Sequence, residues 1–200
     1  VPHLTLSGWL ERLESQHPTE IDLGLDRVLT VAEALGVVHG APKTVTVAGT
    51  NGKGSVVALL TAGLKAMGQV VGTYASPHLL RFNERISIDE GEAEDAEIVA
   101  AFEHIEAARG DVSLTYFESA TLAALWLFRQ RKVDVQVLEV GLGGRLDAVN
   151  ILDADVSVIT SIGLDHLDWL GPDRASISRE KAGIARQNRP CIVADRKSTR

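Results

Sequence analysis

Hydrophobic positions along the chain follow two spacings, one typical of helices and one typical of buried strands. Segments with apolar residues at helical spacing predict helices over residues 4–13, over a segment that stops near residue 36, and over residues 53–67, 94–109, 115–131 and 173–186. Short apolar runs, many of them rich in β-branched residues, predict strands over residues 45–48, 70–74, 85–88, 133–140, 156–160 and 191–194. Strands and helices therefore alternate along most of the chain.

This alternation predicts the fold class. From residue 45 onward, a strand, a loop, a helix and a second strand follow one another within about thirty residues, which is the length of a βαβ unit. Such a unit implies a parallel sheet with a right-handed crossover. We therefore expect an α/β domain with a mostly parallel sheet and flanking helices. Ligands of these sheets bind at the carboxyl ends of the strands, where Gly49 and Ser76 both fall.

The composition fits one soluble globular domain, or a piece of a larger one. Of the 200 residues, 45% are hydrophobic and 24% charged, and the net charge of -7 predicts no general attraction to nucleic acid or to a membrane. Residues 56–64 are too short an apolar run to span a bilayer, and the first residues lack a targeting pattern. Cys191 is the only cysteine, so no internal disulfide can form, and we expect its thiol in the core of a cytoplasmic protein.

Residues 44–55 read Thr-Val-Thr-Val-Ala-Gly-Thr-Asn-Gly-Lys-Gly-Ser. A β-branched strand that leads through a glycine-rich loop into a helix is typical of a phosphate-binding loop. We expect Lys53 to neutralise the β- and γ-phosphates of ATP and Ser55 to face a magnesium ion. The loop departs from the common G-x-x-x-x-G-K-[ST] pattern, because Gly54 separates Lys53 from Ser55, so a tight glycine turn with an exposed lysine is the alternative.

Other chemically capable residues follow the ends of predicted strands. Ser76, Glu139 and His166 could offer a hydroxyl, a carboxylate and an imidazole to Mg²⁺, although imidazole is an unusual ligand for that ion. From spacing alone, a hydrogen-bonded loop histidine is the favoured interpretation of His166. Lys181 follows Glu180 on a predicted helix, where sequence alone favours a solvated surface ion pair. Gly24 indicates either a plain turn or a close approach to another group.

Together these motifs resemble the Mur ligase superfamily. Residues 49–55 are similar to its phosphate loop, and this explains the additional glycine at Gly54. From Trp9 onward the chain resembles the folylpolyglutamate synthase branch, in particular the bacterial bifunctional dihydrofolate synthase/folylpolyglutamate synthases. The stretches that carry this resemblance are residues 76–79, 81–86, 115–118, 138–147, 164–166 and 171–173.

The resemblance implies a role for each matching residue. It implies that ATP is bound by the loop residues Gly49, Thr50, Asn51, Gly52, Lys53, Gly54 and Ser55. Magnesium would be bound by Ser76, Glu139 and His166, and Lys181 would match the lysine that the family carbamylates. Lys53, Glu139, His166 and Lys181 would then be the catalytic residues. The pterin substrate would contact Asp22, Leu23, Gly24, Leu25, Thr115, Tyr116, Phe117, Glu118, Leu146, Asp147 and Ala148.

The implied reaction is ATP-dependent amide formation. A carboxylate of dihydropteroate, or the γ-carboxylate of a folate, would accept the γ-phosphoryl group, and the amine of L-glutamate would displace phosphate from the acyl phosphate. The implied fold is the P-loop NTPase-like central domain of Mur ligases, and we expect a monomer. Family members are about twice as long, so we expect residues 1–200 to be an incomplete ATPase domain without the C-terminal Rossmann-like domain, unable to complete ligation alone. The alternatives are another Mur-type amide ligase and a non-catalytic nucleotide-binding module.

Overall fold

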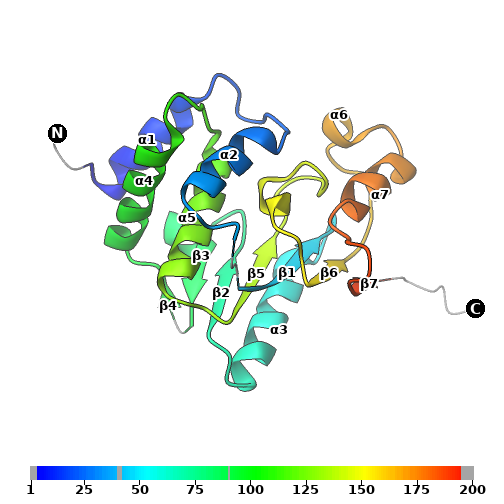
Figure 1. The fold of residues 1–200 in the computed structure, drawn as a ribbon. Coiled ribbons are helices and arrows are strands. Elements are labelled where there is room, and N and C mark those ends of the chain that lie inside the picture. Colours follow the sequence, from blue (N-terminus) through cyan, green and yellow to red (C-terminus); the bar gives the residue numbers. More distant parts are fainter. Residues whose placement is uncertain (1–3, 40–41, 90, 195–200) are drawn as a thin grey trace, which may run out of the picture.

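The computed structural model describes residues 4–39, 42–89 and 91–194. Within these residues, seven strands form one sheet in the order β4-β3-β2-β5-β1-β6-β7 (Figure 1). Strands β2, β5, β1, β6 and β7 run parallel to one another, whereas β3 is antiparallel to β2 and to β4. The strands are β1 (Lys43–Ala48), β2 (Val71–Tyr74), β3 (Ile86–Ile88), β4 (Gly91–Glu92), β5 (Val135–Glu139), β6 (Val156–Ile159) and β7 (Cys191–Val193).

Helices cover both faces of this sheet. Helix α3 (Lys53–Ala66) packs on one face, where Val57 contacts strand residues such as Val47 and Val137. A thicker layer of α1 (Leu6–Gln16), α2 (Asp26–Ala34), α4 (Asp95–Arg109) and α5 (Tyr116–Gln130) covers the other face and contains most of the buried side chains. The remaining elements are η1 (Phe82–Arg85), η2 (Ala148–Ile151), α6 (Leu167–Leu170) and α7 (Arg174–Ala182).

Local sequence explains where several helices begin and end. The Thr115 hydroxyl accepts a hydrogen bond from the Glu118 N–H at 3.2 Å, and the Glu118 carboxylate accepts one from the Thr115 N–H at 2.7 Å. This reciprocal capping box begins α5 and buries a carboxylate whose oxygens have partners. Helix α7 begins in a similar way, since the Asp173 carboxylate accepts a hydrogen bond from the Ser176 N–H at 2.7 Å. Gly68, with φ +81, follows the end of α3.

The structure confirms the predicted fold class and the principal helices and strands. Four short elements are not predicted from the sequence: η1, which begins at Phe82 within a segment expected to be irregular over residues 75–83, and β4, η2 and α6. The prediction that the Cys191 thiol lies in the core was wrong, because Cys191 is exposed. The physical reason is that β7 is an edge strand, paired only with β6, and all three of its residues are exposed.

None of the described helices combines the length and the apolar character that a bilayer crossing requires.

Close packing between α5 and the sheet depends on a residue without a side chain. Gly72 lies in β2, and a Cβ atom built there would be 2.5 Å from a ring carbon of Phe128, which is fully buried. Real side chains do not approach this closely, so the ring occupies the space that any larger residue at position 72 would need. Gly63 differs, because it lies on the exposed side of α3 with no atom within 4 Å of such a Cβ.

This contrast predicts opposite effects for one substitution. Gly72→Ala should lower the free energy of unfolding by about 1–3 kcal/mol through overpacking against Phe128. Gly63→Ala should raise it by up to about 1 kcal/mol, because alanine is favoured over glycine inside a helix. Urea unfolding followed by circular dichroism measures both changes. Equal effects of the two substitutions would contradict the packing argument.

Candidate active site

The glycine-rich loop between β1 and α3 is held against the end of β6. Gly49 has φ +151, and a Cβ atom there would lie 1.7 Å from the Thr160 hydroxyl oxygen, so only glycine fits. That hydroxyl donates a hydrogen bond to the Asn51 carbonyl oxygen at 2.8 Å. The Thr50 N–H donates to the Ser161 carbonyl oxygen at 2.7 Å. The loop therefore has a fixed position at the carboxyl ends of the two strands.

Two further hydrogen bonds complete the attachment of the loop. The Gly163 N–H donates to the Thr50 hydroxyl at 2.9 Å, and the Ser161 hydroxyl donates to the Asn51 carbonyl oxygen at 3.1 Å. The side chain of Thr50 and the main chain of Asn51 are thus bound to the segment that follows β6. This leaves the loop N–H groups nearest α3 to bind a ligand.

Lys53 begins α3 and turns back over the loop. Its Nζ donates to the carbonyl oxygens of Gly49 at 3.1 Å and Thr50 at 3.5 Å. Gly52, with φ +84, precedes the helix and has no side chain to cap it, so the first N–H groups of α3 have no side-chain acceptor there. Gly54 and Ser55 are exposed in the first turn. Free N–H groups, a lysine and a hydroxyl at a helix N-terminus form an arrangement suited to polyphosphate.

Glu139 ends β5 beside this loop and is almost fully buried. Its Oε2 accepts a long hydrogen bond of 3.4 Å from the Ser76 N–H, and the described residues offer its carboxylate no other hydrogen bond. Burial raises the pKa of Glu139, and the positive charge of Lys53 partly opposes that rise. A buried carboxylate with so little hydrogen bonding is expensive unless a cation binds it. Glu139 therefore fits a divalent metal ion.

The three predicted metal ligands are only partly brought together. Ser76 and Glu139 are in contact through the Ser76 N–H. His166 is exposed, and its imidazole Nε2 lies 3.7 Å from Oδ2 of the neighbouring Asp165, whose Oδ1 accepts a hydrogen bond from the His166 N–H at 2.9 Å. The described residues contain no group of three His, Cys, Asp or Glu side chains placed to hold a metal ion. Metal binding by these residues therefore stays a prediction.

Asp147 lies in the loop that connects β5 to β6 and is buried. Its carboxylate accepts hydrogen bonds from the Leu142 N–H at 2.8 Å and from the Val149 N–H at 3.1 Å. Burial raises its pKa to about 6, and these N–H donors and Lys53 limit the rise. Ala148 beside it is buried, and Leu146 is half-buried.

Lys181 lies on α7 and is buried. The prediction of a surface ion pair, which its sequence context favours, was therefore wrong. Glu180 instead pairs with Arg145, with 3.0 Å between Arg145 Nη2 and Glu180 Oε1. The Lys181 carbonyl oxygen accepts a hydrogen bond from the Ile184 N–H, whereas its ammonium group has no hydrogen bond or ion pair with the described residues. Burial lowers the pKa of Lys181, and the charge of Lys53 lowers it further. A buried amine with a lowered pKa is the form of lysine that can react as a nucleophile.

Helix α7 packs directly on the glycines that follow β5. A Cβ atom at Gly144 would lie 2.8 Å from the Glu180 carbonyl oxygen and 3.2 Å from the Lys181 Cα. A Cβ atom at Gly183 would lie 2.4 Å from the Cβ of Arg145. The Arg145 N–H also donates to the Glu180 carbonyl oxygen at 2.8 Å. The position of Lys181 thus depends on the glycines that follow β5, in particular Gly144.

The predicted substrate segments are joined by Arg27, a residue that the sequence interpretation did not select. Arg27 Nη1 lies 2.9 Å from Asp22 Oδ2, and Arg27 Nη2 lies 3.1 Å from Glu118 Oε1. His17 Nε2 contacts the same Asp22 oxygen at 3.2 Å. Asp22 and Glu118 are therefore brought together although they are far apart in sequence. No local pattern marked Arg27, because its partners lie on other elements.

Other residues of these segments are placed as follows. Leu23, Gly24 and Leu25 are half-buried, and a Cβ at Gly24 would meet only the Arg27 guanidinium at 4.0 Å, so no described residue approaches Gly24 closely. Tyr116 is half-buried, and the Phe117 ring lies so near Gly141 that a Cβ there would be 2.6 Å away. Thr115 is buried in the capping box of α5.

Thr160, Ser161 and Gly163 were also missed as attachment points for the glycine-rich loop. The signal that could have found them is the polar cluster directly after an apolar strand. Their contacts with Thr50 and Asn51 span more than a hundred residues of sequence, however, so their role required the fold.

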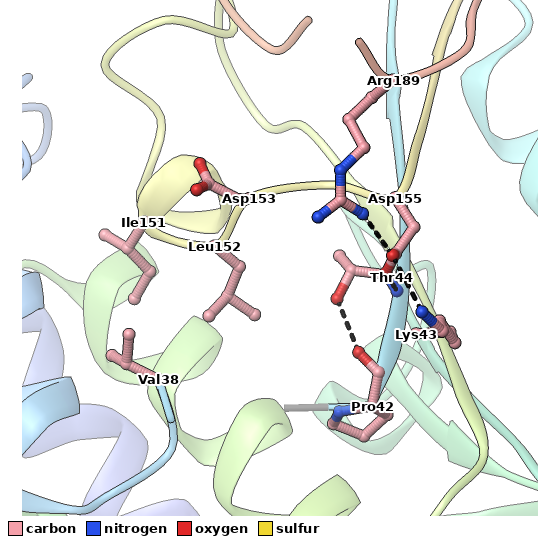
Figure 2. A pocket seen from close by; sticks show the side chains of 9 residues that line it. All are labelled: Val38, Pro42, Lys43, Thr44, Ile151, Leu152, Asp153, Asp155 and Arg189. Atoms are coloured by element: carbon pink, nitrogen blue, oxygen red, sulfur yellow. Dashed lines mark hydrogen bonds and ion pairs between the residues drawn. The ribbon is translucent and has the colours of Figure 1, made fainter. Parts of the chain in front are cut away.

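A cavity lies at the other end of the sheet. It measures about 390 Å³ and is lined by Val38, Pro42, Lys43, Thr44, Ile151, Leu152, Asp153, Asp155 and Arg189. Lys43 and Arg189 point toward Asp155, which they neutralise (Figure 2). The cavity adjoins the amino ends of β1 and β6, and parallel sheets bind ligands at the carboxyl ends. We therefore assign the candidate site to the glycine-rich loop and not to this cavity.

The chain is similar to proteins of known family. Dihydrofolate synthase/folylpolyglutamate synthase of Escherichia coli (strain K12) is 58% identical over 190 residues, a match that covers 95% of this chain and 45% of the E. coli protein. The structure of E. coli FolC in complex with DHPP and ADP is 58% identical, with a TM-score of 0.93, over 95% of this chain and 46% of that chain. A bifunctional folylpolyglutamate synthase/dihydrofolate synthase with Mn, AMPPNP and L-glutamate bound is 57% identical, with a TM-score of 0.89, over 95% of this chain and 46% of that chain.

The chain thus spans less than half the length of these relatives. Its residues 47–197 match the sequence profile of the Mur ligase middle domain, and this segment contains the glycine-rich loop, Glu139 and Lys181. The chain therefore belongs to the Mur ligase middle domain family.

Proposed function

We propose that this chain is the ATP-binding part of an amide ligase that joins L-glutamate to dihydropteroate, to the γ-carboxylate of folates, or to both. One observation carries the proposal. The buried Glu139 carboxylate lies beside the start of α3, since a Cβ atom at Gly54, next to Lys53, would be 3.9 Å from its Oε2, and the loop that follows Glu139 packs on the backbone of the buried Lys181. A positive charge at a helix N-terminus, a buried carboxylate and a buried amine thus share one site. Relatives with known ligands support the assignment, because their structures hold ADP with DHPP, or AMPPNP with Mn and L-glutamate.

The residues present fit ATP and a divalent cation. The free N–H groups at the start of α3 and the Lys53 ammonium would hold the phosphates, and the buried Glu139 carboxylate would hold the cation together with Ser76. When bound, the cation supplies positive charge to the phosphate oxygens. Phosphoryl transfer needs positioning and charge stabilisation more than a protein nucleophile. Lys53 is fixed by its contacts with the loop carbonyls and needs little rearrangement for this role.

The acceptor would bind where Arg27 joins Asp22 to Glu118, next to Phe117 and Asp147. Carboxylates held by an arginine can accept hydrogen bonds from the amino groups of a pterin, and the rings of Tyr116 and Phe117 offer apolar surface to its aromatic part. A module that only binds nucleotide would need neither a buried carboxylate beside the phosphate loop nor a buried lysine. These two groups favour a ligase over such a module.

The substrate class is tested by an ADP-release assay with ATP, Mg²⁺ and L-glutamate, in which dihydropteroate and tetrahydrofolate are offered separately. The assay uses both the 200-residue chain and a chain extended to the length of the relatives. Glutamate-dependent ADP release by the extended chain with either acceptor supports the proposal, and release with neither contradicts it. We expect no steady glutamate-dependent release by the 200-residue chain, because the relatives contain as much chain again.

Lys53→Met should weaken ATP binding. Loss of the ammonium group removes a charge-assisted interaction with the phosphates, which is worth about tenfold or more in affinity. Lys65→Met, on the last turn of the same helix, is the matched control and should leave the affinity unchanged. Isothermal titration calorimetry with Mg-ATP measures both variants, and thermal unfolding checks that they fold. An unchanged dissociation constant for Lys53→Met would remove the phosphate loop from the proposal.

Lys181 should form a carbamate with carbon dioxide. Its neutral amine would attack the carbon of CO₂, a C–N bond would form as one C–O π bond opens, and a proton would leave to solvent. Because burial and Lys53 lower its pKa, the neutral amine is present at a lower pH than in an ordinary lysine, and the carbamate should increase as pH rises.

Carbon-13 NMR of the chain in labelled bicarbonate at about pH 8, below the ordinary lysine pKa, measures this adduct. The carbamate resonance should disappear in Lys181→Gln. It should persist in Lys132→Gln, which removes an exposed lysine. A spectrum of the unsubstituted chain without a carbamate resonance would show that Lys181 stays a free amine.

A further inference from the structure

Arg85 lies at the carboxyl end of β2, on the same edge of the sheet as the glycine-rich loop. It ends η1, and its carbonyl oxygen accepts a hydrogen bond from the Ala75 N–H at 2.9 Å. The next residue, Ile86, pairs with Tyr74 in the antiparallel ladder between β2 and β3. Arg85 is half-buried, so its charge is partly withdrawn from water.

The guanidinium group of Arg85 is held in a fixed place. Its Nε donates a hydrogen bond to Nδ1 of His78 at 2.8 Å. Its central carbon lies 5.7 Å from the ring centre of Phe82 and 5.4 Å from that of Tyr116. Two aromatic rings and an imidazole therefore set both the position and the orientation of the group.

None of these neighbours carries a negative charge. Burial raises the pKa of the Tyr74 and Tyr116 hydroxyls, which stay protonated at neutral pH. Within the described residues Arg85 has no ion pair with a carboxylate. Eight other arginines of the described chain do form one: Arg12, Arg27, Arg81, Arg109, Arg131, Arg145, Arg186 and Arg189. Arg85 is thus an oriented, partly buried cation that lacks an anion.

Its surroundings indicate where that anion would come from. His78 belongs to the loop of Ser76, whose N–H contacts Glu139 beside the phosphate loop. Tyr116 belongs to the segment to which the acceptor was assigned, and the adjacent Phe117 ring packs against Gly141. Arg85 therefore bridges the phosphate side and the acceptor side of the site.

We propose that Arg85 binds the carboxylate of the acceptor substrate, the group that receives the phosphoryl group. The proposal rests on the proposed function, since it requires a pteroate or folate acceptor. Guanidinium and carboxylate groups match in geometry, and a pair shielded by aromatic rings is weakened less by solvent than an exposed one. The alternative is that Arg85 only joins Phe82 to Tyr116 and stabilises the fold.

The test uses two ligands that differ only in the carboxylate: 7,8-dihydropteroate, and 6-(anilinomethyl)-7,8-dihydropterin, in which hydrogen replaces it. Dissociation constants are measured by calorimetry for the unsubstituted chain, Arg85→Gln and Arg85→Lys. Arg131→Gln is the control, because Arg131 pairs with Glu97 on the helical layer. Thermal unfolding of each variant reports folding separately.

If Arg85 binds the carboxylate, Arg85→Gln should weaken dihydropteroate binding by about 10- to 100-fold, the usual range for a hydrogen bond to a charged group. The same variant should bind the ligand without the carboxylate as the unsubstituted chain does. Arg85→Lys should recover part of the lost affinity, and Arg131→Gln should change neither constant.

Two outcomes would overturn the proposal in distinguishable ways. Equal weakening of both ligands by Arg85→Gln would show a structural role for Arg85 and leave the proposed substrate intact. Failure of the unsubstituted chain to bind dihydropteroate at all would overturn the proposed substrate, and the carboxylate role of Arg85 with it.

Discussion

The site depends on the contact between the glycine-rich loop and the end of β6. Gly49 has no Cβ, which allows the Thr160 hydroxyl to reach the Asn51 carbonyl oxygen. Without that approach, the loop could not keep its contacts with Thr160 and Ser161. The parallel order of β5, β1 and β6 then places Glu139 on one side of the loop and Thr160 on the other. The position of the loop within the site thus depends on the missing Cβ of Gly49 and on the hydroxyl of Thr160.

The electrostatics of the site follow from burial. Folding buries the side chains of Glu139, Asp147 and Lys181. In each of them, loss of hydration is the largest cause of the pKa shift toward the neutral form. Lys53 opposes the shift of the two carboxylates and adds to that of Lys181. A single fixed cation thus acts in opposite senses on neighbouring acids and on a neighbouring base. Titratable groups with perturbed pKa values cluster at functional sites in this way.

Much of this fold could be predicted from the sequence, because periodicity and turn residues are local signals. The β-branched run before Gly49 and the glycine after α3 marked their elements correctly. Short pieces such as α6 were missed, since four residues carry too little periodicity to detect. Cys191 was placed in the core because sequence alone does not tell an edge strand from a central one.

The site residues likewise divide into those with a local sequence signal and those without one. Lys53 could be selected because it follows a glycine-rich loop at the start of a predicted helix, and Glu139 because it lies at the end of a predicted strand. The burial of Lys181 could not be seen, since it depends on the glycines of a loop far away in sequence. Arg27 and Arg85 were missed for the same reason: their partners lie on other elements, and a single sequence does not reveal those contacts.

The packing of α7 on the glycines after β5 has an evolutionary consequence. Backbone atoms of Glu180 and Lys181 lie where side chains at Gly144 would be, and Arg145 fills the space beside Gly183. Neither segment can accept a larger residue unless the other retreats. Across related sequences, these two segments should therefore covary or both stay unchanged. A substitution in one should persist only together with a compensating substitution in the other.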